Sequence, residues 1–152
     1  MSRERIEVMQ RACRAWETGE LDVFHELYTP DVTADGGGIW LESGDVAKGV
    51  DAVIRNFAVL IGAFEKNELT PEGAIETGDT LVVPLLWRGL LPDGAEFVEQ
   101  RLIGVFGFRG VQITSMTWFE GLGDALDAVG LPRSAAGNMI PLERQPLARD
   151  GT

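Results

Sequence analysis

The feature that most constrains this chain is a run of three long strand-like segments in its second half. The segments are TLVVPLLWRGLL (80–91), AEFVEQRLIGVFGF (95–108) and VQITSMTWFEG (111–121), joined through the short turns PDG and RG. Turns of this kind connect neighbouring antiparallel strands. The sequence therefore predicts an antiparallel sheet built from consecutive hairpins.

Residues inside these segments indicate the shape of the sheet. Pro84 interrupts one segment, and Gly104 and Gly107 interrupt the next. Proline or glycine within a strand is typical of a bulge or a sharp bend, so we expect a strongly curved sheet. The segment 80–91 is apolar on both faces and needs cover on both sides. Helices are expected on one side, and a second copy of the chain, forming a homodimer, on the outer face.

The first half of the chain has helical spacing instead. Apolar residues recur every three or four positions near the N-terminus, at Ile6, Met9, Cys13 and Trp16. A short second helix is expected from Leu21 to just before Pro30, and a strongly amphipathic third one over 50–64. Helices followed by long antiparallel strands predict an α+β fold.

Composition limits the classes of function. The 152 residues are 45% hydrophobic, which suits one globular core, and carry a net charge of −11. This charge argues against nucleic acid and anionic membrane surfaces as partners, because both require a basic footprint. No apolar run reaches transmembrane length and no signal-peptide pattern begins the chain, so we expect a soluble cytoplasmic protein.

The reactive residue types are scarce. Cys13 is the only cysteine and falls on the apolar face of the first expected helix, which favours a buried thiol over a nucleophile. His25 is the only histidine, so a His-rich metal site is excluded and a Ser–His–Asp set is disfavoured. No phosphate-binding loop or Rossmann glycine motif is present. We expect no metal and no organic cofactor.

Four blocks of the sequence together carry a family resemblance. They are AWETGELDVFHELYTPDV, KGVDAVIRNF, IETGDTLVV and GVFGFRGVQITSMTWF. In this order they closely resemble the SnoaL-like branch of the nuclear transport factor 2-like superfamily, over roughly residues 5–131. The resemblance implies a cone-shaped, curved antiparallel sheet around a deep apolar pocket that N-terminal helices close, usually in a homodimer. Residues 1–131 would form this domain, and 132–152 a tail that is flexible or packs on a neighbouring subunit.

The resemblance leaves the reaction open, because this fold hosts isomerases, cyclases, dehydratases, epoxide hydrolases and proteins without catalysis. Two branches lack their usual groups here. The tyrosine and two aspartates of ketosteroid isomerases align with Ala12, Gly36 and Gly104. The aspartate–arginine–aspartate set of limonene epoxide hydrolases aligns with Leu86, Arg88 and Trp118. Conventional members of either branch are therefore disfavoured.

Two other branches leave candidate carboxylates. SnoaL-like polyketide cyclases place an acid after the tryptophan of the last strand, where this chain has Trp118 and then Glu120. Polyether epoxide-opening cyclases pair an aspartate near the first strand with a glutamate on the next strand, which suggests Asp35 with Glu68 or Glu72. Asp35 and Glu120 are thus the predicted catalytic acid/base residues, and Arg88 would stabilise developing negative charge.

Strand alternation supports part of this assignment and also offers plain alternatives. Met116, Trp118 and Glu120 share one face of the last segment, so a pocket on that side would place Glu120 at its rim with a raised pKa. Alternatively, Glu120 is hydrated at the strand end or stabilises the next helix N-terminus. Asp35 before three glycines also suits an ordinary turn. Arg88 either points inward with a carboxylate partner or outward in a salt bridge.

The leading hypothesis is a cofactor-independent enzyme that acts on a hydrophobic polyketide- or terpenoid-like substrate. Its reaction would be cyclisation, isomerisation or epoxide opening by carboxylate acid/base catalysis. The alternatives are a non-catalytic protein that binds a hydrophobic ligand, and a dimerisation module of the same fold. The residues expected to contact the small molecule are Trp40, Phe57, Leu86, Met116 and Trp118.

Overall fold

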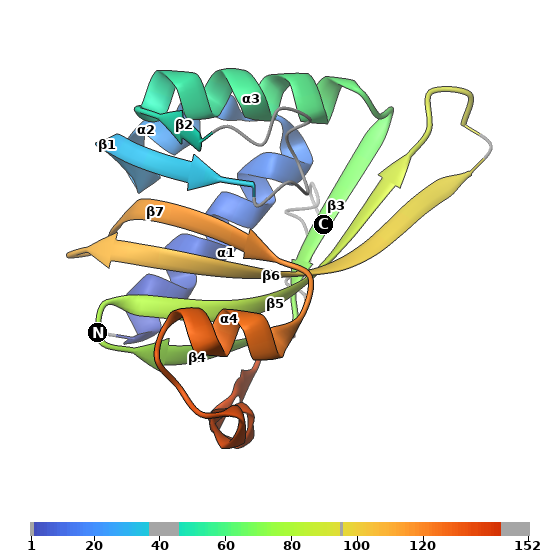
Figure 1. Ribbon diagram of the computed structural model, residues 1–152. Coiled ribbons are helices and arrows are strands. Elements are labelled where there is room, and N and C mark those ends of the chain that lie inside the picture. Colours follow the sequence, from blue (N-terminus) through green and yellow to red (C-terminus); the bar gives the residue numbers. More distant parts are fainter. Residues whose placement is uncertain (1, 37–45, 95, 144–152) are drawn as a thin grey trace.

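The computed structural model describes residues 2–36, 46–94 and 96–143, which form helices packed on a strongly curved sheet (Figure 1). The helices are α1 (Ser2–Thr18), α2 (Phe24–Leu27), α3 (Val50–Gly62) and α4 (Leu122–Ala128), with short 3-10 helices η1 (Leu21–Val23) and η2 (Arg133–Asn138). The strands are β1 (Tyr28–Asp35), β2 (Val46–Lys48), β3 (Lys66–Pro71), β4 (Gly73–Thr77), β5 (Thr80–Leu90), β6 (Phe97–Arg109), β7 (Gln112–Phe119) and β8 (Ile140–Pro141). The α+β fold with a curved sheet is confirmed.

The sheet keeps the predicted hairpins and adds one pairing that joins distant parts of the chain. Its order is β2-β1-β7-β6-β5-β4-β8, and β3 pairs with β5 beside β4. The pairs are antiparallel except β1 with β7, which run parallel. Short turns can only make antiparallel neighbours, so this parallel pair depends on tertiary packing. It brings Tyr28 opposite Ile113.

Irregularities in the sheet occur where strands change partner or direction. The β6–β7 register shifts between Gly107 and Phe108, as the glycine in this strand predicted. Pro84 stays in register with Ile103 on β6. On its other edge, the Pro84 carbonyl accepts a hydrogen bond of 2.8 Å from the Glu72 amide, between the end of β3 and the start of β4. Proline therefore lies where one partner strand replaces another.

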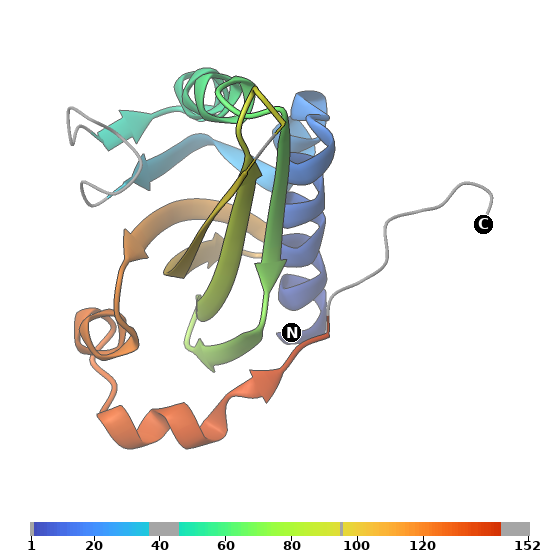
Figure 2. The ribbon, with the colours of Figure 1, turned by 90° about the vertical axis from the view of Figure 1, so that its right-hand side faces the viewer.

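The N-terminal helices cover the concave face of the sheet. In Figure 2, α1 runs along one side of the sheet and α3 lies across one end of it. The predicted apolar stripe of α1 is buried, with Met9, Cys13 and Trp16 all at most 5% exposed. α3 contributes Val53 and Phe57 to the same core cluster. No helix in the three described stretches is long and apolar enough to cross a membrane.

The outer face of the sheet carries a second, smaller core. Helix α4 and η2 lie on this side (Figure 2) and pack on strand residues. The buried residues of this second core are Ile75, Val82, Ile103, Ala125, Leu126 and Ala135. The chain itself therefore covers part of the face for which we expected only a second subunit. Within the predicted tail 132–152, residues 133–138 form η2 and β8 pairs with β4, and 144–152 lie outside the described residues.

Candidate functional site

A largely apolar cavity lies between the N-terminal helices and the concave face of the sheet. Its volume is about 620 Å³, counted together with the space at its open mouth. Helices α1 to α3 and strands β1, β3, β6 and β7 all contribute to its wall. The lining residues are Ala12, Cys13, Trp16, Phe24, Tyr28, Ala34, Gly36, Asn56, Phe57, Leu60, Leu69, Phe106, Met116 and Trp118.

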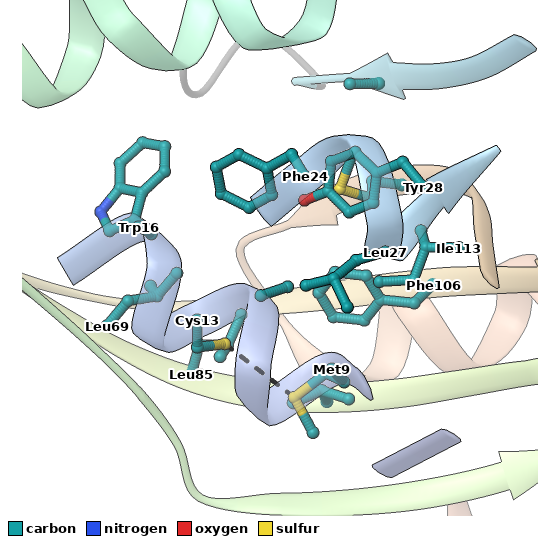
Figure 3. Packing of buried hydrophobic residues seen from close by; sticks show 14 of the residues in the cluster. Met9, Cys13, Trp16, Phe24, Leu27, Tyr28, Leu69, Leu85, Phe106 and Ile113 are labelled. Carbon is teal, nitrogen blue, oxygen red and sulfur yellow. Dashed lines mark hydrogen bonds between the residues drawn. The ribbon is translucent and has the colours of Figure 1, made fainter. Parts of the chain in front are cut away.

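Aromatic rings in mutual contact form much of the wall (Figure 3). The Phe57 ring on α3 forms an edge-to-face pair with the Trp16 ring, with 5.1 Å between the ring centroids. It forms a second such pair with the Phe24 ring, with 5.2 Å between the centroids. Phe24 in turn stacks on Tyr28 at 5.0 Å. Offset-stacked and edge-to-face pairs are the preferred aromatic geometries, and they fix the rings in place. The cavity is therefore bounded by side chains with little freedom to collapse into it.

Small residues keep the space between these rings open. Ala34 and Gly36, two positions apart on and after β1, face the cavity from the sheet side. Gly104 on β6 has a different role. A β-carbon there would lie 2.8 Å from the Phe106 ring and 3.0 Å from the Trp118 ring. Glycine at this position therefore allows both aromatic rings to approach the backbone closely.

Two titratable side chains line the cavity, and burial keeps both protonated. Burial raises the pKa of the Tyr28 hydroxyl well above its usual range, and the nearby Cys13 thiol adds to this effect. Burial, reinforced by the Glu17 carboxylate, raises the pKa of Cys13 as well. The thiol is 4% exposed and lies 3.9 Å from the Met9 sulfur. The predicted buried thiol is confirmed, and Tyr28 is a permanent hydrogen-bond donor at neutral pH.

Three of the five predicted ligand contacts lie together in the wall. Phe57, Met116 and Trp118 all line the cavity, although their contact with a ligand stays a prediction. Trp40 lies outside the described residues. Leu86 is half-buried on β5 and is not among the lining residues. Its neighbours Leu85 and Trp87 belong to the inner core, and alternation along the strand turns Leu86 to the outer face.

Arg88 also lies on the outer face of β5. Its guanidinium forms ion pairs of 3.2 Å with both Glu68 and Glu99 and lies 4.2 Å from the centre of the Phe97 ring. The preceding residue, Trp87, points inward and donates an indole hydrogen bond of 3.0 Å to Asn67. Arg88 therefore points outward and forms salt bridges, as the second alternative for it stated, and it does not line the cavity.

Glu120 lies beyond the end of the last strand. Strand β7 ends at Phe119, and α4 begins at Leu122, with Gly121 as its N-cap. The side chain of Glu120 is exposed and is not among the lining residues, whereas Trp118 two positions earlier is. The period-2 alternation that would have placed Glu120 beside Trp118 stops with the strand. The geometry agrees with the strand-end alternative.

Asp35 is the predicted carboxylate that lies closest in sequence to the cavity wall. It ends β1, is half-buried, and pairs with Val46 of β2 and Thr117 of β7. Its neighbours Ala34 and Gly36 both line the cavity, so alternation directs the carboxylate to the other side of the strand. Its two predicted partners are occupied elsewhere: Glu68 pairs with Arg88, and Glu72 pairs with Arg101.

The model of one protein family matches most of this chain. The match is to the SnoaL-like domain and spans residues 9–116, which include the described lining residues of the cavity except Trp118. The chain belongs to the SnoaL-like domain family. No curated protein matches the sequence.

Solved structures similar to this SnoaL-like domain share its fold at low sequence identity. A candidate SnoaL-like polyketide cyclase from Jannaschia sp. CCS1 is 23% identical with a TM-score of 0.65, over 85% of this chain and 93% of that one. A Mycobacterium tuberculosis protein in complex with estradiol-17β-hemisuccinate is 20% identical with a TM-score of 0.66, over 78% and 95%. The epoxide hydrolase/cyclase-like enzyme SalBIII, from polyether salinomycin formation, is 22% identical with a TM-score of 0.64, over 81% and 95%. These similarities confirm the nuclear transport factor 2-like fold.

Sequence reasoning did not identify several wall residues of this SnoaL-like domain. Tyr28, Phe24 and Asn56 all line the cavity. Phe24 had a usable signal, since it repeats the helical spacing of Leu21 and Leu27. Tyr28 had none, because it stands at the junction of α2 and β1, where neither helical nor strand periodicity applies. Its inward direction follows from the pairing of β1 with β7.

Proposed function

We propose that this SnoaL-like domain binds an uncharged, hydrophobic small molecule in the cavity. The observation that carries the proposal is the chemistry of the wall: among the described residues that line it, none has a charged side chain. A buried ionised group without a partner is strongly disfavoured, so this wall selects against charged ligands. Each methylene group that the ligand buries contributes about 0.8 kcal/mol.

The similar structure in complex with estradiol-17β-hemisuccinate supports the hydrophobic part of this proposal, since the same fold there holds a steroid derivative; the carboxylate of that ligand is not part of the support. Rings fixed by mutual contact favour a preformed site, because little conformational entropy is lost when a ligand enters.

The second candidate is a cofactor-independent enzyme that opens epoxides, cyclises or isomerises a polyketide- or terpenoid-like substrate in the same cavity. The position of Asp35 favours it, since this carboxylate stands between two lining residues at the end of β1. A change of side-chain direction in the last residue of the strand would bring it to the cavity as a general base. Similar folds in a candidate polyketide cyclase and an epoxide hydrolase/cyclase-like enzyme support this candidate.

A homodimer through the remaining outer sheet face is part of the proposal. Leu86 is half-buried there, and Phe97 is 43% exposed beside the ion-paired Arg88. An aromatic residue and an arginine among apolar neighbours is the composition typical of an interface. Sedimentation equilibrium of the wild type and of Leu86→Glu tests this assembly, and a monomeric wild type would exclude it.

Binding is tested with N-phenyl-1-naphthylamine, an uncharged hydrophobic fluorophore. We expect saturable fluorescence enhancement with the wild type. Ala34→Leu places a larger side chain in the cavity and should weaken binding by at least about fivefold, since overpacking costs roughly 1–3 kcal/mol. Ala58→Leu makes the same change on the exposed side of α3 and should bind like the wild type. Equal affinity of Ala34→Leu and wild type would contradict the proposed site.

The enzyme candidate is tested separately with limonene oxide as substrate and gas chromatography of the products. Ring opening by the wild type, lost in Asp35→Asn with unchanged N-phenyl-1-naphthylamine affinity, would establish Asp35 as an acid/base residue. Turnover that survives Asp35→Asn would exclude that role. Binding of the fluorophore without any turnover leaves the ligand-binding function alone.

A further inference from the structure

The hydroxyl of Tyr28 is a polar group that the apolar cavity does not explain. Tyr28 is the only tyrosine of the chain, and its side chain is 3% exposed. In Figure 3 the hydroxyl points inward beside the Phe24 ring, and the residue lines the cavity. The hydroxyl has no hydrogen-bond partner within residues 2–36, 46–94 and 96–143. A hydroxyl that borders the cavity without a protein partner can donate its proton to a ligand there.

The position of this hydroxyl is fixed from three sides. The Tyr28 ring stacks on Phe24, and its face meets Phe57 edge-on with 6.3 Å between centroids. Its backbone pairs with Ile113 on β7. The Gln112 side-chain amide donates to the carbonyls of Glu26 at 3.1 Å and of Tyr28 at 3.4 Å, which ties the end of α2 to β7. The donor is therefore preorganised, and a ligand that binds to it loses little of its interaction energy to ordering.

We propose that Tyr28 is the polar anchor of the cavity and donates a hydrogen bond to a single uncharged acceptor, a carbonyl or ether oxygen, on an otherwise apolar ligand. This inference rests on the proposed ligand-binding function and specifies the ligand class. The phenol stays protonated at neutral pH and so always offers its proton. Because no cation lines the described wall, the acceptor is a neutral oxygen and not a carboxylate or phosphate.

The other polar groups of the wall are less suited to this task. The Cys13 thiol is a weak donor and is in contact with the Met9 sulfur. Asn56 is half-buried on α3 and carries both a donor and an acceptor, so it does not discriminate between ligand groups. The indole N–H groups of Trp16 and Trp118 are also donors in this wall. Tyr28 carries the one hydroxyl among the described lining residues, on a ring held by Phe24 and Phe57.

A matched pair of probes tests the anchor: 2-decalone, and decalin, which lacks only the carbonyl oxygen. Binding is followed through the emission of Trp16 and Trp118 in the cavity wall. The wild type should bind 2-decalone about threefold to tenfold more tightly than decalin, the gain of one neutral hydrogen bond. Tyr28→Phe, which keeps the ring, should remove this preference and leave decalin affinity unchanged. Met116→Leu, an apolar wall change of similar volume, should alter both affinities by the same factor.

A measurement on the wild type alone provides the second readout. Since Tyr28 is the only tyrosine, labelling tyrosine with ¹³C at Cζ gives one resonance that reports its hydroxyl. We expect 2-decalone to shift this resonance much more than decalin does at equal occupancy. Equal shifts would overturn the inference even if Tyr28→Phe failed to fold.

The outcomes separate the inference from the function beneath it. If decalin binds but the preference for 2-decalone persists in Tyr28→Phe, or disappears in Asn56→Leu instead, the cavity binds ligands and Tyr28 is not the anchor. If neither probe binds the wild type and N-phenyl-1-naphthylamine also fails, the ligand-binding function is wrong and the inference with it.

Discussion

Arg5 and Asp79 form an ion pair of 3.0 Å between the first turns of α1 and the turn that joins β4 to β5. The guanidinium also donates to the carbonyl oxygens of Gly110 at 2.9 Å and Gly78 at 3.3 Å, and it lies 5.6 Å from the centre of the Phe108 ring. A single side chain, 15% exposed, therefore ties the start of the first helix to two hairpin turns of the sheet.

Arg5→Ala should lower the free energy of unfolding by about 1–3 kcal/mol, because the ion pair and both hydrogen bonds from a charged donor to turn carbonyls are lost together. Urea unfolding monitored by circular dichroism measures the change. Arg3→Ala removes an exposed arginine of the same helix and should stay within about 0.5 kcal/mol of the wild type. Equal effects of the two substitutions would show that Arg5 does not join helix and turns.

Gly104→Ala should weaken ligand binding and lower stability together. The added β-carbon would meet the rings of Phe106 and Trp118 at 2.8 and 3.0 Å, so at least one ring must move. We expect a cost of about 1–3 kcal/mol in unfolding free energy, with weaker binding of N-phenyl-1-naphthylamine. The control is Gly121→Ala, where a β-carbon meets nothing within 4 Å and the backbone φ is −128°. Wild-type affinity in Gly104→Ala would contradict this account of the wall.

Asn67→Ala should be strongly destabilising for a polar-to-alanine change. The side chain is 5% exposed, accepts the Trp87 indole hydrogen bond at 3.0 Å and donates to the Ile61 carbonyl at 3.1 Å. It thereby joins the end of α3 to β3 and β5. Loss of both bonds should cost about 2–4 kcal/mol, measured by thermal and urea unfolding. Lys66→Ala, at the exposed neighbouring position, is the matched control, and a similar loss there would exclude the network as the cause.

The Asp31–Arg109 pair should make stability depend on acid pH. Arg109 donates two hydrogen bonds of 3.2 Å to the carboxylate, and with Thr29 it lowers the pKa of Asp31 below its usual value. A depressed folded-state pKa stabilises the fold above the unfolded-state pKa of about 3.9, and this contribution is lost as the pH falls through the folded-state value. Urea titrations from pH 6 to pH 2 should therefore show a smaller acid loss in Asp31→Asn than in the wild type. Glu7→Gln, an exposed carboxylate on α1, serves as control, and identical profiles for Asp31→Asn and wild type would contradict the pair's role.

Several elements could be read from the chain because their signal is local. The stripe of Met9, Cys13 and Trp16 defined the buried side of α1, and the turns PDG and RG defined the β5–β6–β7 meander. Gly107 correctly indicated an irregularity in β6. These patterns repeat with the period of the backbone itself, so neighbouring residues alone determine them.

The site was less accessible to such reasoning. Alternation assigned Met116 and Trp118 to the cavity wall, but it also extended to Glu120, where the strand has already ended. Alternation could not choose between the two faces for Leu86 and Arg88, because 80–91 is apolar on both sides. That choice depends on which face α1 and α3 cover, and which face α4 and η2 cover.

By itself, the sequence determined the secondary structure of the long elements, the curved α+β sheet and the family, since each depends on periodicity, turn chemistry and the spacing of motifs. The tertiary structure decided the parallel pairing of β1 with β7, and with it the inward direction of Tyr28. It also decided that α4 and η2 cover the outer face in the same chain. These relationships join residues far apart in sequence. They form because burying apolar surface stabilises the arrangement in which distant surfaces are complementary in shape, and no local pattern encodes that complementarity.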